Sequence, residues 1–452
     1  MLKSFQSIQI FLYIFYTFNQ IGAQIKSGPM LAYVEYRTAK IWCEAEGGAN
    51  LILKYWPTNL PSQVKEAYVT THKAFSFETF EYDLVDLIAG TEYNYQVFNK
   101  KTKIHGANGS FKTQEIWKWR KSAPDFKFLA GSCNYVNDVE FDRPGKPYGS
   151  DSIIFTTMAK EKPTFMLWLG DSWYTREPDF QSKWGLWYRA SHDRATPVVQ
   201  QFLKSTSHIG IWDDHDYGPN NEGISYHLKE EAREVFKAYF PNPSFGFHGK
   251  GTYTKVTYYD VDLFLMDNRT WRTSDNMNPY IGDKPNPEKK MFGPEQMSWL
   301  KNSLLNSTNT FKIIVNGSQS LNKTSSGDCW ANYPVELEEL LEFIEFYKIN
   351  GVLFLSGDKH ISEIIKLERL NSYPLYDITT SSLTAGISKV WGQEINNPLR
   401  VNNILLEEHN YGRFSISGPS KEREIKIEFV DINGKSRREF VIKESDISYN
   451  KK

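Results

Sequence analysis

Two stretches near the middle of the chain decide how the rest is interpreted. Residues 165–174 read FMLWLGDSWY, and residues 209–221 read IGIWDDHDYGPNN. Each begins as a short apolar run of β-type residues and then changes abruptly to acidic and aromatic residues. Similar apolar runs that end in small or polar residues occur at 126–133 (FKFLAGSC), 262–269 (DLFLMDNR), 311–318 (FKIIVNGS) and 351–358 (GVLFLSGD).

Amphipathic segments typical of helices alternate with these strands. They lie at 184–192, 225–240, 293–306 and 335–349. Apolar strands separated by helices favour a layered α/β core. After about residue 400 the β-type residues return, and we expect these last strands to extend a sheet of the body rather than to form a third domain.

The first part of the chain follows a different pattern. Between residues 28 and 112, seven short β-type runs are separated by turn residues, with no group of candidate catalytic residues among them. This pattern predicts a β-sandwich of the fibronectin or immunoglobulin type over residues 24–118. The α/β body then covers residues 119–445, and residues 446–452 are expected to be a tail outside the fold.

Residues 1–23 have the layout of a secretory signal peptide. Lys3 precedes an apolar run of 11 residues at 8–18, and the small residues Gly22 and Ala23 follow it. A spanning helix needs about 20 apolar residues, so a cleaved signal is favoured over a membrane anchor. We therefore expect a mature chain without a transmembrane segment that is secreted or periplasmic.

Composition excludes several classes of protein. The 452 residues include 53 basic and 54 acidic side chains, which argues against a surface that tracks nucleic acid. An apolar fraction of 40% excludes a disordered chain, and 3 cysteines exclude a disulfide-stapled scaffold. Cys43 lies in a β-type run, where a buried thiol is ordinary, whereas Cys133 lies in a Gly-Ser-Cys turn that suggests metal binding.

Candidate ligands follow the apolar strands of the body. Ligands bind at the carboxyl ends of strands in open α/β sheets, so these side chains are expected to meet. A single such motif is weak, because a buried Asp often caps a helix and a lone His is more often structural. Together they have the elements of a two-metal hydrolase centre. The candidates are Cys133, Tyr135, Asp171, Tyr174, Asp213, Asp214, His215, Asp216, Asp358, His360 and Glu363.

The order GSC, GDSWY, WDDHDYGPN, LMDNRTWR and SGDKH resembles the alkaline phosphatase D (PhoD-like) family of metallophosphatases. The resemblance covers residues 28–442. It implies a calcineurin-like fold, a two-sheet sandwich flanked by helices, behind an Ig- or fibronectin-like module. Purple acid phosphatases are more distant relatives with a similar plan. The implied activity is hydrolysis of phosphate mono- or diesters, with a small-molecule, lipid or nucleotide ester as the substrate.

The resemblance also implies a set of metal ligands, which are Cys133, Asp171, Tyr174, Asp214, Asp358 and His360. Cys133, Tyr174 and His360 would bind the first metal, usually Fe³⁺ in this family. Asp171 would bridge to the second metal, commonly Ca²⁺. Asp214, which stands where related phosphatases have Asn, would bind this second ion together with Asp358, and carboxylate ligands suit such a hard cation.

Catalytic roles follow from the same resemblance. A water bound to two cations loses a proton near neutral pH, and the resulting hydroxide attacks phosphorus. His215 would donate a proton to the leaving oxygen. Arg269 and Arg272 have the spacing to bind phosphate oxygens, with an ion pair to Asp267 as the alternative interpretation. Asn220 would orient the substrate or the second metal.

Two other functions are considered. One is a related esterase that acts on another kind of ester, and the other is a glycan-binding or adhesion protein on a retained phosphatase scaffold. A binding module descended from an enzyme is expected to lose some metal ligands. This chain keeps Cys133, Asp171, Asp214, Asp358 and His360, which favours the enzyme.

Overall fold

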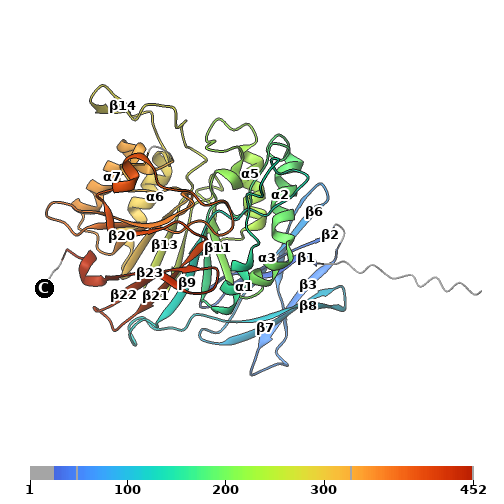
Figure 1. Cartoon of the computed structure of the whole chain (residues 1–452). Coiled ribbons are helices and arrows are strands. Elements are labelled where there is room, and N and C mark those ends of the chain that lie inside the picture. The colour runs from blue at the N-terminus through green and yellow to red at the C-terminus, as the bar shows by residue number, and fades with distance from the viewer. Residues whose placement is uncertain (1–24, 47–48, 326–327, 450–452) are drawn as a thin grey trace, which may run out of the picture.

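The computed structural model describes residues 25–46, 49–325 and 328–449 (Figure 1). The predicted signal peptide over residues 1–23 lies outside the described residues. In Figure 1 the N-terminal strands, coloured blue, lie at one side of a larger body of strands and helices. The catalytic motifs of the sequence belong to this body.

Two sheets form the centre of the body. The larger sheet contains, in spatial order, β23 (Ser436–Lys443), β22 (Glu424–Asp431), β21 (Asn410–Ser417), β9 (Phe126–Gly131), β10 (Phe165–Leu169), β11 (Ser207–Ile211), β1 (Ile25–Val34), β2 (Ala39–Glu46), β6 (Phe77–Leu84) and β5 (Tyr68–Ala74). The second contains β12 (Thr254–Tyr258), β13 (Val261–Leu265), β16 (Phe311–Asn316), β17 (Val352–Ser356), β19 (Leu375–Thr379), β18 (Ser362–Leu367) and β20 (Arg400–Leu406).

Alternating side chains along the strands build two cores. Leu167 of β10 lies in a core with Ile314 of the second sheet, whereas its neighbour Trp168 lies in another core with Phe155 and Phe236 from helices. Successive strand residues point to opposite faces, so one face of the larger sheet packs on the second sheet and the other on helices.

Helices cover the outer faces of both sheets. The helices on the larger sheet are α1 (Ile153–Lys160), α2 (Lys183–Ala195), α3 (Pro197–Leu203) and α5 (Lys229–Tyr239), and those on the second sheet are α6 (Gly293–Asn306) and α7 (Pro334–Phe346). Pro294 and Pro334 lie in the first turns of α6 and α7, where a missing N–H costs nothing. This order of helix, sheet, sheet and helix confirms the predicted layered α/β body (Figure 1).

The N-terminal strands are divided between two sheets. Four of them, β3 (Leu51–Pro57), β4 (Lys65–Glu66), β7 (Glu92–Asn99) and β8 (Thr102–Lys112), form a separate sheet in the order β4-β3-β7-β8. This sheet shares a core with β1, β2 and β6 that includes Ile41, Leu53 and Val97. The Ig- or fibronectin-type topology stays a prediction. Through the parallel pair Leu31 and Ser207, β1 also joins β11, so the module continues a sheet of the body.

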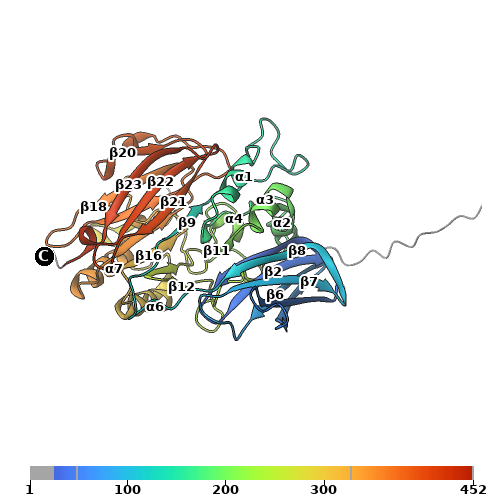
Figure 2. The same cartoon turned by 90° about the horizontal axis from the view of Figure 1, so that it is seen from below.

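The C-terminal strands extend the larger sheet, as expected. β21 pairs antiparallel with β9, and Figure 2 shows β21–β23 in red at the end opposite to the blue N-terminal strands. The structure corrects the predicted tail, because Glu444–Ile447 form a short helix, η3, and Ile447 is buried. Tyr449 also donates its N–H to Asn350 Oδ1 at 2.8 Å. The smaller elements are β14 (Tyr280–Ile281), β15 (Lys284–Pro285), η1 (Trp330–Asn332) and η2 (Gly392–Asn396).

Parallel pairing brings the carboxyl ends of several strands together. β9, β10 and β11 are parallel neighbours, and so are β13, β16 and β17. The loop after β10 passes very close to the loop after β11. A Cβ on Gly170, whose φ is +91°, would lie 2.5 Å from Asp213 Cβ. Only glycine permits this approach, which brings the two acidic motifs into one site.

Candidate metal centre

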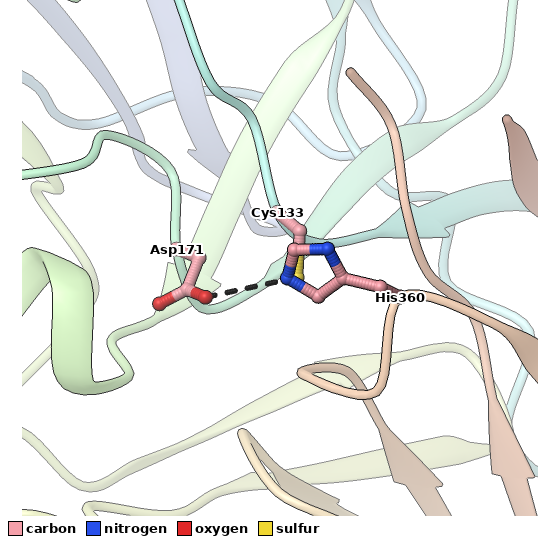
Figure 3. A group of neighbouring side chains, drawn as sticks. All are labelled: Cys133, Asp171 and His360. Atoms are coloured by element: carbon pink, nitrogen blue, oxygen red, sulfur yellow. Dashed lines mark hydrogen bonds between the residues drawn. The ribbon is translucent and has the colours of Figure 1, made fainter. Parts of the chain in front are cut away.

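Three side chains from three loops meet at the carboxyl ends of the strands (Figure 3). Cys133 follows β9, Asp171 follows β10 and His360 lies between β17 and β18, and one ligand atom of each lies within 4.8 Å of the other two. The Tyr174 hydroxyl lies 3.1 Å from both Asp171 Oδ2 and His360 Nε2. A thiol, a carboxylate, a phenol and an imidazole, the side chains predicted for the first metal, are therefore together.

A second group of ligand atoms consists mainly of carboxylates. Asp171 also lies within 4.8 Å of ligand atoms of Asp214 and His215, and Asp213, Asp214 and Asp358 form another set of the same size. Asp171 therefore belongs both to the thiol-containing set and to the set with Asp214 and His215, and its bridging role stays a prediction. Asp213, a candidate ligand from the sequence that the family resemblance did not assign to a metal, also joins the second group.

The donor atoms of both groups fit cations. Asp213 Oδ2 and Asp214 Oδ1 are buried and have no hydrogen-bond partner among the described residues. This is unfavourable for carboxylate oxygens unless a cation binds them. The thiol and imidazole suit a transition metal, whereas the carboxylates suit a harder ion. The residues present therefore fit two cations of different kinds.

Burial and mutual repulsion raise the pKa values of several of these groups when no cation is bound. Burial, followed by the charge of Asp214, raises the pKa of Asp171 well above its usual value. Burial also raises the pKa of the Cys133 thiol to about 12 and that of Asp213 to about 7. Because metal ligands must be deprotonated, cation binding at this site would release protons.

Four candidate ligands have a left-handed backbone. The φ angles of Cys133, Asp171, Asp358 and His360 are +62°, +52°, +63° and +54°. Such a conformation costs a non-glycine residue on the order of 1–3 kcal/mol and is typical of functional sites. The surrounding fold therefore fixes the directions of these side chains against a local preference.

The carboxylate of Asp216 accepts hydrogen bonds from the backbone of both acidic loops. Its Oδ2 accepts hydrogen bonds from the N–H groups of Asp171 (2.6 Å) and Asp213 (2.9 Å), and its Oδ1 accepts one from Ser172 (2.8 Å). One carboxylate thereby joins the loops after β10 and β11. The sequence had offered Asp216 only as a candidate ligand. The capping-box spacing from Asp213, the N-cap of the short helix α4 (Asp214–Tyr217), is the signal that points to this role.

His215 is largely buried and lies beside Asp171 and Asp214. Its ring stacks on Tyr174 with 4.1 Å between ring centres, and its backbone N–H donates to Asp171 Oδ1 at 3.2 Å. Its Nε2 lies 4.0 Å from Asp214 Oδ2, while its Nδ1 has no hydrogen-bond partner among the described residues. Burial lowers the pKa of His215.

The two arginines of the sequence motif are buried in a network of carboxylates. Arg269 Nε donates to Asp213 Oδ1 at 2.7 Å, and its Nη2 donates to Asp328 Oδ2 at 2.6 Å. Arg272 pairs with Asp328 and with Asp275. Among the described residues, neither guanidinium forms the alternative ion pair with Asp267. Asp267 Oδ1 instead accepts a hydrogen bond from the backbone N–H of Arg269. Sequence reasoning missed Asp328, because it follows a polar segment rather than an apolar strand.

A pocket of about 560 Å³ opens beside this cluster. Its lining includes Tyr174, His215 and Asn220, so the pocket borders the candidate metal ligands. The neighbouring Asn221 donates its N–H to Asp214 Oδ2 at 2.8 Å. Asn220 thus lines the pocket beside the cluster, whereas the backbone of Asn221 binds a carboxylate of the second group.

Comparison with known proteins agrees with the sequence motifs. The sequence model of the PhoD-like phosphatase family matches residues 150–409, more than half of the chain. The chain belongs to the PhoD-like phosphatase family. This confirms the resemblance noted from the sequence. The family match begins after Cys133 and therefore does not include this candidate ligand. The fold of the PhoD-like chain is what brings Cys133 to the site.

A curated relative and two solved structures resemble this PhoD-like chain. Alkaline phosphatase D of Bacillus subtilis (strain 168) is 26% identical over 254 residues, which cover 45% of this chain and 42% of the relative. The match therefore spans less than half of that relative's length. A structure of PhoD has a TM-score of 0.73 at 18% identity and covers 92% of this chain and 89% of that chain. A purple acid phosphatase from yellow lupin (Lupinus luteus) seeds has a TM-score of 0.67 at 11% identity, covering 92% and 74%. At these identities the two structures share the fold.

Proposed function

We propose that the chain is a metal-dependent phosphoesterase that hydrolyses phosphate mono- or diesters. The observation that carries this proposal is the position of Asp171, which contributes to the thiol-containing group and to the carboxylate group. One carboxylate can therefore bridge two cations at the carboxyl ends of the strands, in a chain of a phosphatase family.

The proposed first ion is Fe³⁺ and the second is Ca²⁺. Cys133, Tyr174 and His360 would hold the iron, and Asp213, Asp214 and Asp358 would hold the calcium, with Asp171 between them. Two such cations supply charge neutralisation for the phosphoryl oxygens and a water acidic enough to act as nucleophile near neutral pH.

His215 is proposed as the proton donor to the leaving oxygen. It lies beside both ligand groups and lines the pocket, so its ring is accessible to an ester bound there. The stacking of the ring on Tyr174 supports a fixed ring that, once protonated, can deliver a proton.

Arg269, Arg272 and Asn220 are proposed to contact the substrate. Arg269 Nη2 lies 3.9 Å from Asp214 Oδ1, at the edge of the carboxylate group, where its charge can stabilise the phosphoryl oxygens. Arg272 shares its partner Asp328 with Arg269, and its buried Nε and Nη1 have no hydrogen-bond partner among the described residues. Asn220 lines the pocket beside His215.

Export of the mature chain is also part of the proposal. The signal-like layout of residues 1–23 supports secretion or transfer to a periplasm. Among the described helices, none has the length and apolarity needed to cross a membrane.

The activity is tested with purified chain on p-nitrophenyl phosphate and bis(p-nitrophenyl) phosphate. We expect hydrolysis of at least one ester with Fe³⁺ and Ca²⁺ supplied, and loss of that activity after chelation. The variant Asp171→Asn is expected to be inactive, and Asp283→Asn, at an exposed position between β14 and β15, is the matched control. No hydrolysis of either ester by the metal-loaded chain would overturn the proposal.

The two alternative functions predict different results. An esterase for other esters would hydrolyse a carboxylic ester or a phosphotriester faster than either test substrate. A glycan-binding protein would bind sugars without hydrolysing any of these esters. The meeting of all the predicted metal ligands at one site supports the phosphoesterase over the binding protein.

A further inference from the structure

The pocket beside the metal centre contains more aromatic and apolar surface than a phosphate group needs. Its lining includes the rings of Tyr135, Tyr148, Tyr174 and Phe180, together with three prolines, Pro144, Pro147 and Pro219. Its volume of about 560 Å³ lies in the range of pockets that enclose a small organic molecule. Cations and arginines suffice to bind a phosphate, so this apolar surface requires a different partner on the substrate.

The position of the pocket identifies which part of an ester would enter it. Tyr174 and His215 line the pocket and also belong to the candidate metal centre. His215 is the proposed proton donor to the leaving oxygen. The group attached to that oxygen therefore extends from His215 into the pocket, while the phosphoryl group remains at the cations.

Among the tyrosines that line the pocket, Tyr148 has the most exposed ring. Its ring packs edge-on against Tyr135, with 5.0 Å between centres and 78° between planes, and lies 6.4 Å from the ring of Tyr174. Tyr148 is 48% exposed, whereas Tyr135 is 8% and Tyr174 is 3% exposed. The two buried tyrosines and His360, whose Nδ1 lies 3.3 Å from the Tyr148 hydroxyl, therefore fix Tyr148 in place, and Tyr148 retains surface for a ligand.

Arg176 makes this wall rigid before any ligand binds. Its guanidinium donates to the backbone carbonyls of Tyr174 (2.6 Å) and Val136 (2.5 Å) and to Asp142 Oδ1 (3.0 Å). It also lies over the ring of Tyr135, 4.2 Å from the ring centre. A wall that is already ordered loses little conformational freedom when a ligand binds.

The charges of the pocket favour a neutral group. Arg176 pairs with Asp142, and Arg143 pairs with Glu177 at 2.9 Å across the rim. Within the described part of the chain, Lys146 is the one lining cation without an ion pair. One unpaired cation at an exposed position does not build a second anion site, whereas aromatic rings packed edge-on, together with prolines, offer surface on which a flat ring can bind.

We propose that this pocket binds a flat aromatic ring carried by the alcohol of the ester, with Tyr148 as its main contact. The substrate class is then phosphate esters of ring-bearing alcohols, such as nucleosides, in preference to esters of small aliphatic alcohols. This inference rests on the proposed phosphoesterase function.

The test compares two substrates that share a leaving alcohol and differ in the ring. Adenosine 5′-phosphate and ribose 5-phosphate both release a primary sugar hydroxyl, and their methyl diesters extend the comparison to diesters. We expect kcat/KM to be at least about 10-fold higher for the compounds that carry the base. Tyr148→Ala should bring this ratio close to one, and Tyr148→Phe should preserve it. Tyr68→Ala, at an exposed position on β5, is the matched control.

A binding measurement separates failure of this inference from failure of the proposed function. Adenosine lacks a phosphate, so its binding, followed by calorimetry, depends on the pocket alone, and ribose is the control ligand. Adenosine binding that is lost in Tyr148→Ala would support the pocket even if no ester were hydrolysed. Equal turnover of both sugar phosphates without adenosine binding would overturn the inference and leave the phosphoesterase intact. Hexyl phosphate turned over as well as the nucleotide would show a general apolar pocket and would also overturn it.

Discussion

The two halves of the candidate metal centre differ in chemistry although they share Asp171. One half offers a thiol, a phenol and an imidazole from Cys133, Tyr174 and His360, and the other offers the carboxylates of the Asp213 and Asp214 loop with Asp358. Soft and nitrogen ligands select transition metals, whereas carboxylate oxygens suit hard divalent ions. Under the proposed function, this difference favours two unlike cations over a symmetric pair.

One short loop serves both halves. Asp358 and His360, two residues apart after β17, both have left-handed backbone, and they contribute to different ligand groups. The shared loop and the shared carboxylate of Asp171 couple the two halves. Variants on either side therefore show whether the halves are chemically distinct, and variants of the shared residues show whether they act together.

The largest effect is expected for Asp171→Asn, because this change removes a ligand from both halves. We expect kcat/KM for p-nitrophenyl phosphate to fall by more than about 100-fold, beyond the range typical of residues that only support metal ligands. Metal content should fall for both ions. Loss of one ion with the other retained would contradict the bridging role of Asp171.

Tyr174→Phe should affect the first half alone. A phenolate on Fe³⁺ gives a visible charge-transfer absorption, so the variant should lose this absorption while it keeps calcium. We expect activity to fall by roughly 10- to 100-fold. Asp358→Asn is the reciprocal variant and should lower calcium content while the absorption remains. Tyr68→Phe is the control for the tyrosine change. Retained absorption in Tyr174→Phe would place the phenolate elsewhere.

Asp216→Asn tests a residue that positions both loops without binding a cation. An amide cannot accept all the backbone N–H groups that the carboxylate of Asp216 accepts. We expect about a 10-fold loss of kcat/KM, weaker metal binding and a lower melting temperature. An effect as large as that of Asp171→Asn, with complete loss of one ion, would make Asp216 a ligand instead.

The smallest effect concerns the pH dependence of stability in chelated protein. Burial raises the pKa of Asp213 to about 7 and that of Asp216 to about 8, against a usual value of 3.8. Between about pH 4 and 8 these two carboxyl groups therefore bind more protons in the folded chain than in the unfolded chain, so their contribution to stability falls as pH rises. The melting temperature of chelated protein should be lower at pH 8 than at pH 5, with a smaller decrease in Asp213→Asn. A rise over this range would contradict the account.

The fold could be predicted where a local pattern determines it. The apolar runs 165–169 and 352–356 and the start of α6 were visible in the sequence, since each depends on neighbouring residues. The pairing of β1 with β11 was not visible, because it joins residues far apart in the chain. The ordered Ile447 was missed for a similar reason, since one apolar residue in a polar segment gives no periodic signal.

The candidate site was predictable to the extent that its ligands follow strands. Cys133, Asp171, Asp358 and His360 stand directly after apolar runs, and the structure brings them together. Asp328 and Tyr148 lie in irregular segments, so their contacts depend on the path of loops that no sequence pattern describes. The phosphate contacts of Arg269 and Arg272 stay a prediction, because both guanidinium groups already form ion pairs with aspartates of the chain.

The most direct test of two unlike halves is elemental analysis of the purified chain combined with its visible spectrum. We expect one iron and one calcium ion for each chain, with a charge-transfer absorption that disappears in Tyr174→Phe. Zinc as the sole bound metal, or iron without this absorption, would contradict the assignment of Cys133 and Tyr174 to a ferric site.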